Sequence, residues 1–306
     1  MDEFVIQTDG LTKRYGNVLA VDNLSMEVRR GHVYGLLGPN GSGKTTTMGL
    51  LLGLLRPTSG TFSLFGSNDG HEESLRRVGA ITETPSFYPY LSGLQNLKYF
   101  QIISGSGPES ELEGLIDRVG LAGRGGDLFR TYSLGMKQRL GIAYALLGDP
   151  DLIFLDEPTN GLDPEGMIEI RELIRSLGND NRTVLLSSHL LHEVEQICDS
   201  VTIISKGRLI AQGEVSQLVS TAGSERVRTK TTDDGKARQI LSAIDWVEDV
   251  TTDEDALVVT APIERSSELT ATLAHSEVYV AEMMPVRTSL EEYFLEVTGN
   301  AMENPL

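Results

Sequence analysis

The stretch Gly38-Pro39-Asn40-Gly41-Ser42-Gly43-Lys44-Thr45 decides the fold of this chain. It follows an apolar run, Val33 to Leu37, that predicts a buried strand, and it opens a segment, Lys44 to Leu55, that predicts a helix. A strand, a Gly-rich loop ending in Lys-Thr and a helix are together typical of a phosphate-binding loop. Backbone N–H groups of such a loop surround the β- and γ-phosphates, and the helix N-terminus adds partial positive charge. The sequence therefore predicts that the protein binds a nucleoside triphosphate.

The side chains of this loop have separate predicted roles. Lys44 is expected to neutralise the β- and γ-phosphates, and Thr45 to offer its hydroxyl to Mg2+, which takes few protein ligands. The alternative is a Gly-rich turn before a buried helix, which the placement of Lys44 and Thr45 disfavours. The predicted nucleotide-binding residues here are Gly38, Pro39, Asn40, Gly41, Ser42, Gly43, Lys44, Thr45 and Thr46.

Composition limits the class of protein and its partners. The chain has 306 residues, of which 40% are hydrophobic and 23% charged, as expected for a globular protein of about two domains. Its net charge of -18 argues against nucleic acid as the main partner. The longest strongly apolar stretch, Met48 to Leu55, is too short to cross a bilayer, and the acidic N-terminus lacks a signal core. A cytoplasmic location is expected, and the single Cys198 fits a reducing compartment.

Hydrophobic periodicity divides the chain into a large α/β domain over residues 1–220 and a smaller module over 224–306. The large domain begins with predicted strands and continues with a helical insert at about 88–148. It ends with strands that alternate with helices, which indicates a parallel sheet covered on both faces. The predicted strands are 4–8, 24–28, 33–37, 61–64, 152–155, 183–186, 201–204 and 209–212. Besides the helix over 44–55, the predicted helices are 96–103, 109–119, 136–147, 165–177, 190–197 and 214–220.

The smaller module has its own charge and its own pattern of elements. Residues 221–306 carry 7 basic and 17 acidic side chains, so -10 of the net charge lies there. The pattern predicts strand 227–231, helix 235–243, strands 247–251 and 257–260, helix 266–274 and strand 278–283. This order indicates a small α+β, ferredoxin-like domain. A last helix, 289–297, is predicted to start with a capping box between Ser289 and Glu292.

Two carboxylates follow the apolar run Leu152-Ile153-Phe154-Leu155, at the strand end where open α/β sheets bind ligands. Asp156 is suited to hold Mg2+, directly or through water. Glu157 is expected to polarise the attacking water or accept its proton. The alternative is a strand that meets a helix cap, where acidic residues and Pro158 are common.

Three further segments indicate the family. Tyr132-Ser133-Leu134-Gly135-Met136-Lys137-Gln138-Arg139 precedes the acidic strand, Asp156-Glu157-Pro158-Thr159-Asn160-Gly161-Leu162-Asp163 continues it, and Ser187-Ser188-His189 comes later. With the phosphate loop they resemble the ATP-binding cassette (ABC) family of transport ATPases, over Phe4 to about Ser220. The resemblance implies a P-loop NTPase with a β-rich subdomain and a helical insert. It also implies that two subunits dimerise head to tail around two ATP molecules.

The resemblance assigns roles to particular residues of the signature segment. Ser133 and the N–H of Gly135, at a helix N-terminus, would contact the γ-phosphate bound by a second subunit. The family usually has Leu-Ser-Gly-Gly-Gln here, so this segment departs from the pattern at Tyr132, Leu134 and Met136. The alternative for the remaining Ser-x-Gly is a plain helix cap.

Three further residues match family positions: two, His189 and Asp163, end segments quoted above, and the third, Tyr15, lies near the N-terminus. His189 matches the switch histidine, which orients water together with Glu157, although an isolated histidine is usually structural. Asp163 matches the aspartate that crosses the dimer interface toward the partner's phosphate loop. Tyr15 matches the aromatic that stacks on adenine, the alternative being a core tyrosine. The expected catalytic residues are therefore Glu157, His189 and Lys44.

Glu83 departs from the family's usual glutamine, which touches Mg2+ and senses the membrane subunit. A glutamate keeps an oxygen ligand and adds charge, so Thr45, Glu83 and Asp156 are the predicted metal-contacting residues. This glutamate, with Phe87-Tyr88-Pro89-Tyr90, looks like the bacitracin-type and lantibiotic-immunity exporters. The alternative is a tolerated exchange at the surface.

Two classes of function remain open on the sequence. The first is an ATP-hydrolysing subunit that powers a separate integral membrane permease, held at the inner face of the cell membrane by that permease, with antibiotic or peptide export as an extension. The second is a non-transport ABC ATPase that acts on the ribosome or DNA. Ribosomal members usually have two cassettes and DNA-repair members long coiled coils, and neither is visible in this chain.

Overall fold

The structure is a computed structural model, which describes residues 3–68, 72–82, 85–179, 182–221, 225–253, 255–286 and 289–303. The chain forms two compact units. The first is Met1–Val215 together with Val297–Leu306, and the second is Ser216–Glu296. None of the described helices combines the length and the apolar character that a bilayer crossing needs.

An antiparallel sheet opens the first unit, in the order β2–β1–β5–β6, with β3 also paired to β1. Its strands are β1 (Phe4–Tyr15), β2 (Val18–Leu24), β3 (Glu27–Arg29), β5 (Ser59–Leu64) and β6 (Ser67–Asn68). The predicted strand 24–28 is wrong, because Leu24 ends β2 and β3 begins only at Glu27. The first strand runs past residue 8 because its distal half pairs with β2, a long-range contact that the local pattern does not reveal.

The main sheet has the order β11–β10–β4–β9–β8–β7. Its strands are β4 (Val33–Leu37), β7 (Val78–Ile81), β8 (Leu152–Asp156), β9 (Thr183–Ser188), β10 (Ser200–Ser205) and β11 (Arg208–Glu214). All neighbours pair in parallel except β11, which pairs antiparallel with β10. Every residue of β4, β8 and β9 is buried, as expected for strands covered on both faces.

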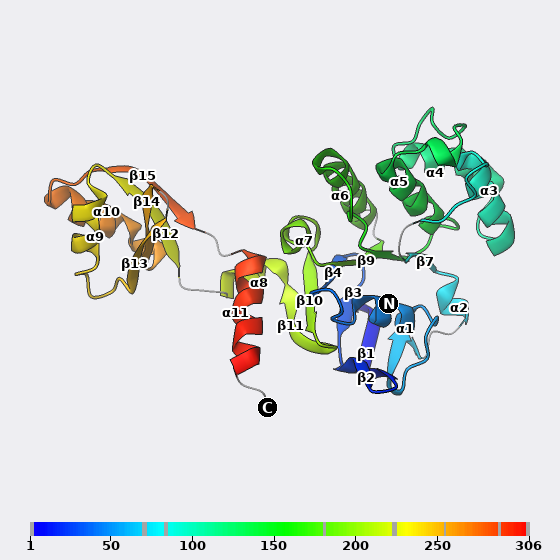
Figure 1. Cartoon of the computed structure of the whole chain (residues 1–306), viewed down its shortest axis with the longest axis horizontal. Coiled ribbons are helices and arrows are strands. Elements are labelled where there is room, and N and C mark those ends of the chain that lie inside the picture. Colours follow the sequence, from blue (N-terminus) through cyan, green and yellow to red (C-terminus); the bar gives the residue numbers. More distant parts are fainter. Residues whose placement is uncertain are drawn as a thin grey trace. The chain divides into compact units, whose positions relative to one another are not determined.

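Helices cover both faces of the main sheet. Helix α1 (Lys44–Leu51) lies on one side, and α6 (Pro164–Asn179) and α7 (Leu191–Ile197) lie on the other (Figure 1). Gly35 permits the close approach of α7, since a Cβ there would lie 2.8 Å from the Val194 side chain. The α/β sheet predicted from the strand–helix alternation is confirmed.

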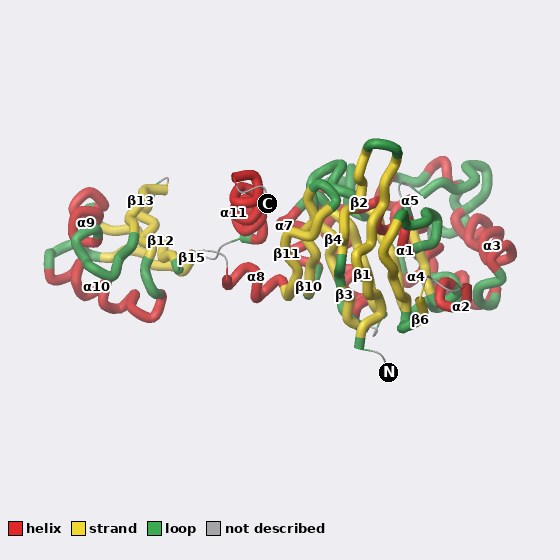
Figure 2. The backbone as a smooth tube through the Cα atoms, turned by 90° about the horizontal axis from the view of Figure 1, so that it is seen from below, coloured by secondary structure: helices red, strands yellow, loops and turns green. Residues whose placement is uncertain are grey.

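The helical insert comprises α3 (Gly93–Ser104), α4 (Leu112–Arg118) and α5 (Leu134–Ala145). These helices gather on one side of the unit, apart from β1 and β2 (Figure 2). A short helix, α2 (Glu72–Leu75), precedes β7, and residues 109–111 form a 3-10 turn in place of the predicted helical start. A capping box between Ser92 and Gln95 starts α3.

The second unit contains a sheet in the order β13–β14–β12–β15, with all pairs antiparallel. Its strands are β12 (Arg226–Thr231), β13 (Asp249–Asp253), β14 (Ala256–Thr260) and β15 (Val280–Val286), and its helices are α9 (Asp234–Leu241) and α10 (Ser266–His275). Leu241, Val259 and Leu269 lie in its apolar core. At the edge of that core, the Arg265 guanidinium lies 3.9 Å from the Trp246 ring centroid. The ferredoxin-like assignment of this module stays a prediction.

Two helices flank this module along the chain, α8 (Val215–Thr221) and α11 (Leu290–Glu303). The predicted capping box is present, because Glu292 N donates to Ser289 Oγ at 3.1 Å and Ser289 N donates to Glu292 Oε2 at 3.3 Å. The predicted domain boundary at 221–224 lies almost entirely outside the described residues.

Candidate functional site

The phosphate loop connects the end of β4 to α1, and its backbone requires glycine at two positions. Gly38 has φ 156°, and a Cβ there would lie 2.2 Å from the carbonyl oxygen of Ile204. Gly43 has φ 107°, and a Cβ there would lie 2.4 Å from the carbonyl oxygen of Ala20. Ser42 is buried, and its Oγ has no hydrogen-bond partner within the described part of the chain. A buried hydroxyl without a partner fits a loop that is built to donate to a phosphate.

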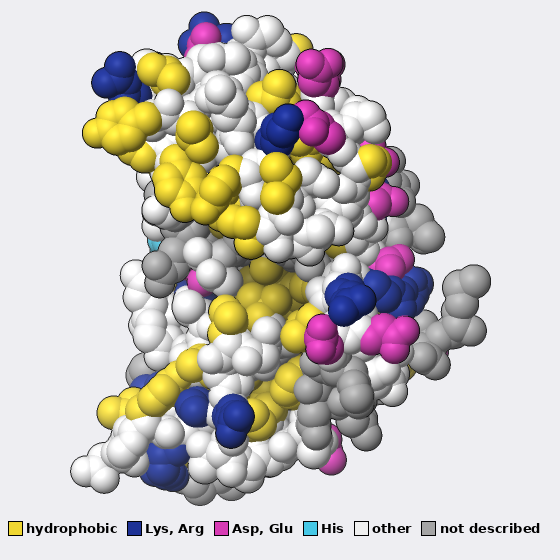
Figure 3. Space-filling view, turned by 90° about the vertical axis from the view of Figure 1, so that its right-hand side faces the viewer, with side chains coloured by type: hydrophobic (Ala, Val, Ile, Leu, Met, Phe, Trp, Pro, Cys, Tyr) yellow, Lys and Arg dark blue, Asp and Glu magenta, His cyan; other side chains and the backbone are white. Residues whose placement is uncertain are grey.

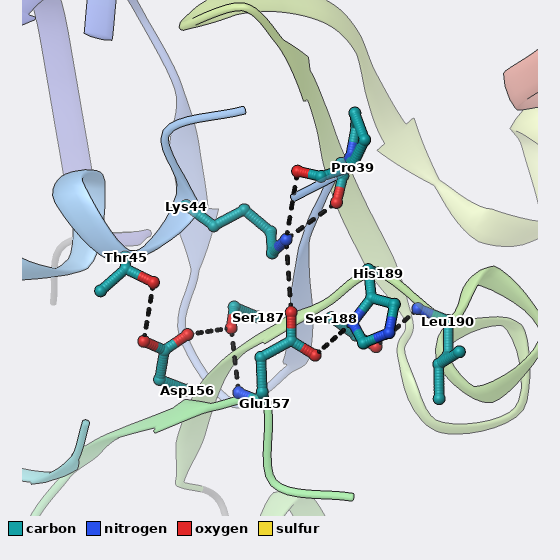
Figure 4. Close-up of polar contacts among 10 residues, drawn as sticks. Pro39, Lys44, Thr45, Asp156, Glu157, Ser187, Ser188, His189 and Leu190 are labelled. Atoms are coloured by element: carbon teal, nitrogen blue, oxygen red, sulfur yellow. Dashed lines mark hydrogen bonds and ion pairs between the residues drawn. The ribbon is translucent and has the colours of Figure 1, made fainter. Parts of the chain in front are cut away.

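Lys44 is the cation of the site and is held by backbone and carboxylate oxygens. Its Nζ donates to the carbonyl oxygen of Gly38 at 2.8 Å and lies 3.5 Å from that of Pro39. It also forms an ion pair with Glu157 Oε1 at 3.3 Å, where Lys44 is 6% and Glu157 22% exposed (Figure 4). The ammonium group is therefore fixed above the loop.

Asp156 ends β8 and points toward the first turn of α1. Thr45 Oγ1 donates to Asp156 Oδ2 at 3.0 Å, and Ser187 Oγ donates to Asp156 Oδ1 (Figure 4). A hydroxyl and a carboxylate at this separation fit Mg2+, which prefers oxygen ligands and takes few of them from protein. Thr45 and Asp156 are therefore suited to hold that ion.

Glu157 lies between Lys44 and His189 at the loop after β8. Its Oε2 lies 2.8 Å from Nδ1 of His189, and its backbone N donates to Ser187 Oγ at 3.0 Å. The backbone of Glu157 has φ 49°, a left-handed conformation that is uncommon for a residue with a side chain. Such conformations concentrate at functional sites, where the surrounding structure enforces them.

Ser187 is the residue of this site to which the sequence assigned no role. It is fully buried and contacts both Asp156 and Glu157. Residues Asp156 and Ser187 are neighbours in the parallel pairing of β8 with β9. The sequence contains both strand ends, but only the strand order reveals that they adjoin.

The signature segment and Asp163 lie together at a second place. Ser133 caps α5 by accepting a hydrogen bond from Met136 N at 3.2 Å, and Asp163 accepts one from Gly166 N at 3.0 Å at the start of α6. Both line a pocket of about 480 Å3, whose other lining residues include Gly135. Among the described residues that line this pocket, none belongs to the phosphate loop.

Tyr132, in the same segment, anchors the start of α5 to the loop at Arg124, elsewhere in the insert. Its hydroxyl donates to the carbonyl oxygen of Arg124 at 2.8 Å, and burial raises the pKa of the phenol. A Cβ at Gly93 would lie 2.2 Å from this hydroxyl, so glycine makes room for it.

The remaining predicted residues are on the surface or outside the described residues. Tyr15 ends β1 and is 46% exposed, with the Lys13 ammonium 5.0 Å from its ring centroid. It is therefore not a core tyrosine. In the loop, Pro39 and Asn40 are exposed and Thr46 is half-buried. Glu83 lies outside the described residues.

A phosphate loop joined to an acidic strand end and a histidine defines a P-loop nucleotide-binding protein, and comparison with known proteins gives its family. A family model described as "ABC transporter" matches residues 21–160. The bacitracin transport ATP-binding protein BcrA of Bacillus licheniformis is 39% identical over 299 residues, covering 96% of this chain and 97% of that protein. The daunorubicin resistance ATP-binding protein DrrA3 of Streptomyces coeruleorubidus is 34% identical, with 98% of each chain covered. The solved structure of cbiO1 from Clostridium perfringens, part of the ABC transporter complex cbiONQ, matches with TM-score 0.65 and 26% identity, covering 72% of this chain and 92% of that one.

The chain belongs to the family of ABC transporter ATP-binding proteins. It binds ATP and hydrolyses it in a reaction coupled to transport. The family and the α/β fold predicted from the sequence are thereby confirmed.

Proposed function

We propose that this chain is the ATP-hydrolysing subunit of an exporter whose cargo is an antibiotic or a peptide. The observation that carries the proposal is the contact chain from Lys44 through Glu157 to His189 at the phosphate loop. The cargo class is supported by the similarity to BcrA and DrrA3, whose names record bacitracin transport and daunorubicin resistance.

In this proposal the contact chain works as a base held between a cation and a histidine. Glu157 accepts the proton of the attacking water. His189 keeps the carboxylate of Glu157 oriented through the contact of its Nδ1 with Oε2. Lys44 leaves Glu157 when phosphate oxygens offer it a stronger partner. Thr45 and Asp156 hold Mg2+, with Glu83 as a further contact. When bound, that ion offsets phosphate charge.

We further propose that the ATP site is completed by a second copy of the chain. Ser133, Gly135 and Asp163 line a pocket to which the described residues of the phosphate loop do not contribute. The N-terminus of α5 offers backbone donors and partial positive charge, and the Ser133 hydroxyl adds a donor, which suits an anion. A head-to-tail dimer brings the partner's γ-phosphate to this helix end, with Tyr15 stacking on adenine.

The surface of the helical insert suits a membrane partner. Figure 3, which views this side, shows hydrophobic side chains gathered over the upper part of the surface. The exposed apolar side chains of the insert include Tyr88, Tyr90, Tyr99, Ile102 and Ile103, and the centroids of the Tyr88 and Tyr99 rings lie 4.8 Å apart. Exposed apolar clusters mark interaction sites. We propose that this cluster docks on a separate permease, which holds the chain at the inner face of the cell membrane, with residues 224–306 as an accessory regulatory domain.

Replacing Glu157 by Gln tests the catalytic part of the proposal. The variant is expected to bind ATP and to dimerise when ATP is bound. Its hydrolysis rate is expected to be about 10²–10⁴-fold lower, because the general base is lost. Phosphate release and size-exclusion chromatography measure these effects, with the exposed Glu172→Gln as the matched control. An unchanged rate in Glu157→Gln would contradict the assignment.

Co-purification tests the membrane partner. Affinity-tagged chain is expressed in its native cells and recovered from solubilised membranes, where a polytopic protein is expected to accompany it. Tyr90→Glu is expected to abolish that association, because Tyr90 is 77% exposed in the cluster. Leu54→Glu, at a residue 68% exposed outside the insert, is the control and is expected to retain the partner. Equal recovery with both variants would refute the docking surface.

A further inference from the structure

The side chain of Arg139 extends from α5, the helix of the signature segment, to α6, the helix that follows Asp163. It is one and a half turns into α5, and its side chain is only 17% exposed. Its guanidinium donates to the carbonyl oxygen of Gly120 at 3.1 Å and forms an ion pair with Glu169 of α6. A planar guanidinium suits such a bridge because its donors have a fixed geometry. Arg139 therefore ties α5 both to α6 and to the loop that follows α4.

A second contact joins the same helices at their N-termini. A Cβ on Gly161 would lie 3.3 Å from Leu134 Cδ2, and a Cβ on Gly135 would lie 4.0 Å from Leu162 Cδ2. The side chain of each leucine thus lies over the glycine of the other segment. Leu134 is one of the residues that depart from the family's usual signature, and here its side chain supplies one half of this apolar contact.

We propose that Arg139 is a positioning residue that makes the N-termini of α5 and α6 one rigid surface for the nucleotide held by a second copy. This inference rests on the proposed head-to-tail dimer. Ser133 caps α5 and Asp163 caps α6, so both reach the partner correctly only if the two helices keep their spacing. A displacement of 1 Å at a binding group is enough to cost about 100-fold in rate. The pairing of Arg139 with Glu169 fixes the spacing one to two turns behind these caps.

The test measures ATP-driven dimerisation of the full chain in the Glu157→Gln background. Arg139→Gln and Glu169→Gln are compared with their double variant by sedimentation velocity, and ATP affinity of the monomer is measured in parallel. The control is Lys98→Gln, which removes an ion pair with Glu109 inside the insert. We expect Arg139→Gln to weaken dimerisation about tenfold, which is about 1.4 kcal/mol. Monomer affinity for ATP is expected to be unchanged, because the phosphate loop is untouched.

Three outcomes decide the inference. A non-additive effect of the double variant, with monomer binding and the control unchanged, supports the coupling of Arg139 to Glu169. Dimerisation equal to that of the parent in Arg139→Gln overturns the positioning role and leaves the proposed function standing. Failure of the Glu157→Gln parent to dimerise with ATP overturns the head-to-tail dimer and this inference with it.

Discussion

Gly43 is the last residue before α1, and replacing it by Ala is expected to destabilise the first unit strongly. Its φ of 107° is costly for any L-residue, by about 1–2 kcal/mol. The added Cβ would also lie 2.4 Å from the carbonyl oxygen of Ala20 in β2, so the loop or the strand must shift. Such overpacking costs about 1–3 kcal/mol. Gly43→Ala is therefore expected to lower the free energy of unfolding by about 2–5 kcal/mol.

Gly41→Ala is the matched control, because it lies in the same loop at positive φ, 79°, and an added Cβ would have no atom of the described residues within 4 Å. Its free energy of unfolding is expected to fall only by the cost of the left-handed backbone conformation, about 1–2 kcal/mol. With a urea m-value of about 2 kcal/mol/M, the midpoints of the two variants should differ by about 1 M in far-UV circular dichroism. A midpoint for Gly43→Ala equal to or above that of Gly41→Ala would refute the steric argument.

Three further predictions concern the core and the catalytic contacts. Burial raises the pKa of Tyr34 to about 12, so the folded protein keeps this proton at pH values where the unfolded chain has lost it. The free energy of unfolding should therefore fall by about 2–3 kcal/mol between pH 10 and 12. Urea titrations across that range should show this fall in the parent and not in Tyr34→Phe. His189→Ala frees the Glu157 carboxylate and should lower kcat about 100-fold in a phosphate-release assay, whereas a change in KM alone would contradict its role. Ser187→Ala leaves Glu157 N without its partner and removes a donor to Asp156, so calorimetry should record a loss of about 1–3 kcal/mol; an unchanged melting temperature would count against these bonds.

The parts of the site that lie within short motifs were predictable from the sequence. Lys44 and Thr45 come at the end of a Gly-rich loop that follows one strand, and Asp156 and Glu157 come at the end of another strand, so the local pattern alone placed each pair near a strand end. Because parallel strands present their carboxyl ends at one edge, these side chains meet in the structure. The role of Ser187 was not predictable, since it depends on β8 and β9 being neighbours.

The antiparallel sheet was harder to predict for a related reason. Residues 18–24 carry Asp22 and Asn23, which indicate a turn, and yet they form β2 through pairing with the distal half of β1. Tertiary pairing here overrides a weak local preference. The contact of Arg139 with Glu169 is equally non-local, because 30 residues separate them along the chain.

The packing of Arg265 against Trp246 makes the second unit optically distinct. Trp246 is the only tryptophan in the sequence, and it belongs to the second unit, whereas the phosphate loop belongs to the first. Excitation at the red edge of protein absorbance therefore reports on residues 216–296 alone, without any introduced dye. Loss of the Arg265 guanidinium from the indole face should shift the emission of Trp246. Binding of a partner that rearranges this module can therefore be followed by the intrinsic fluorescence of the unmodified protein.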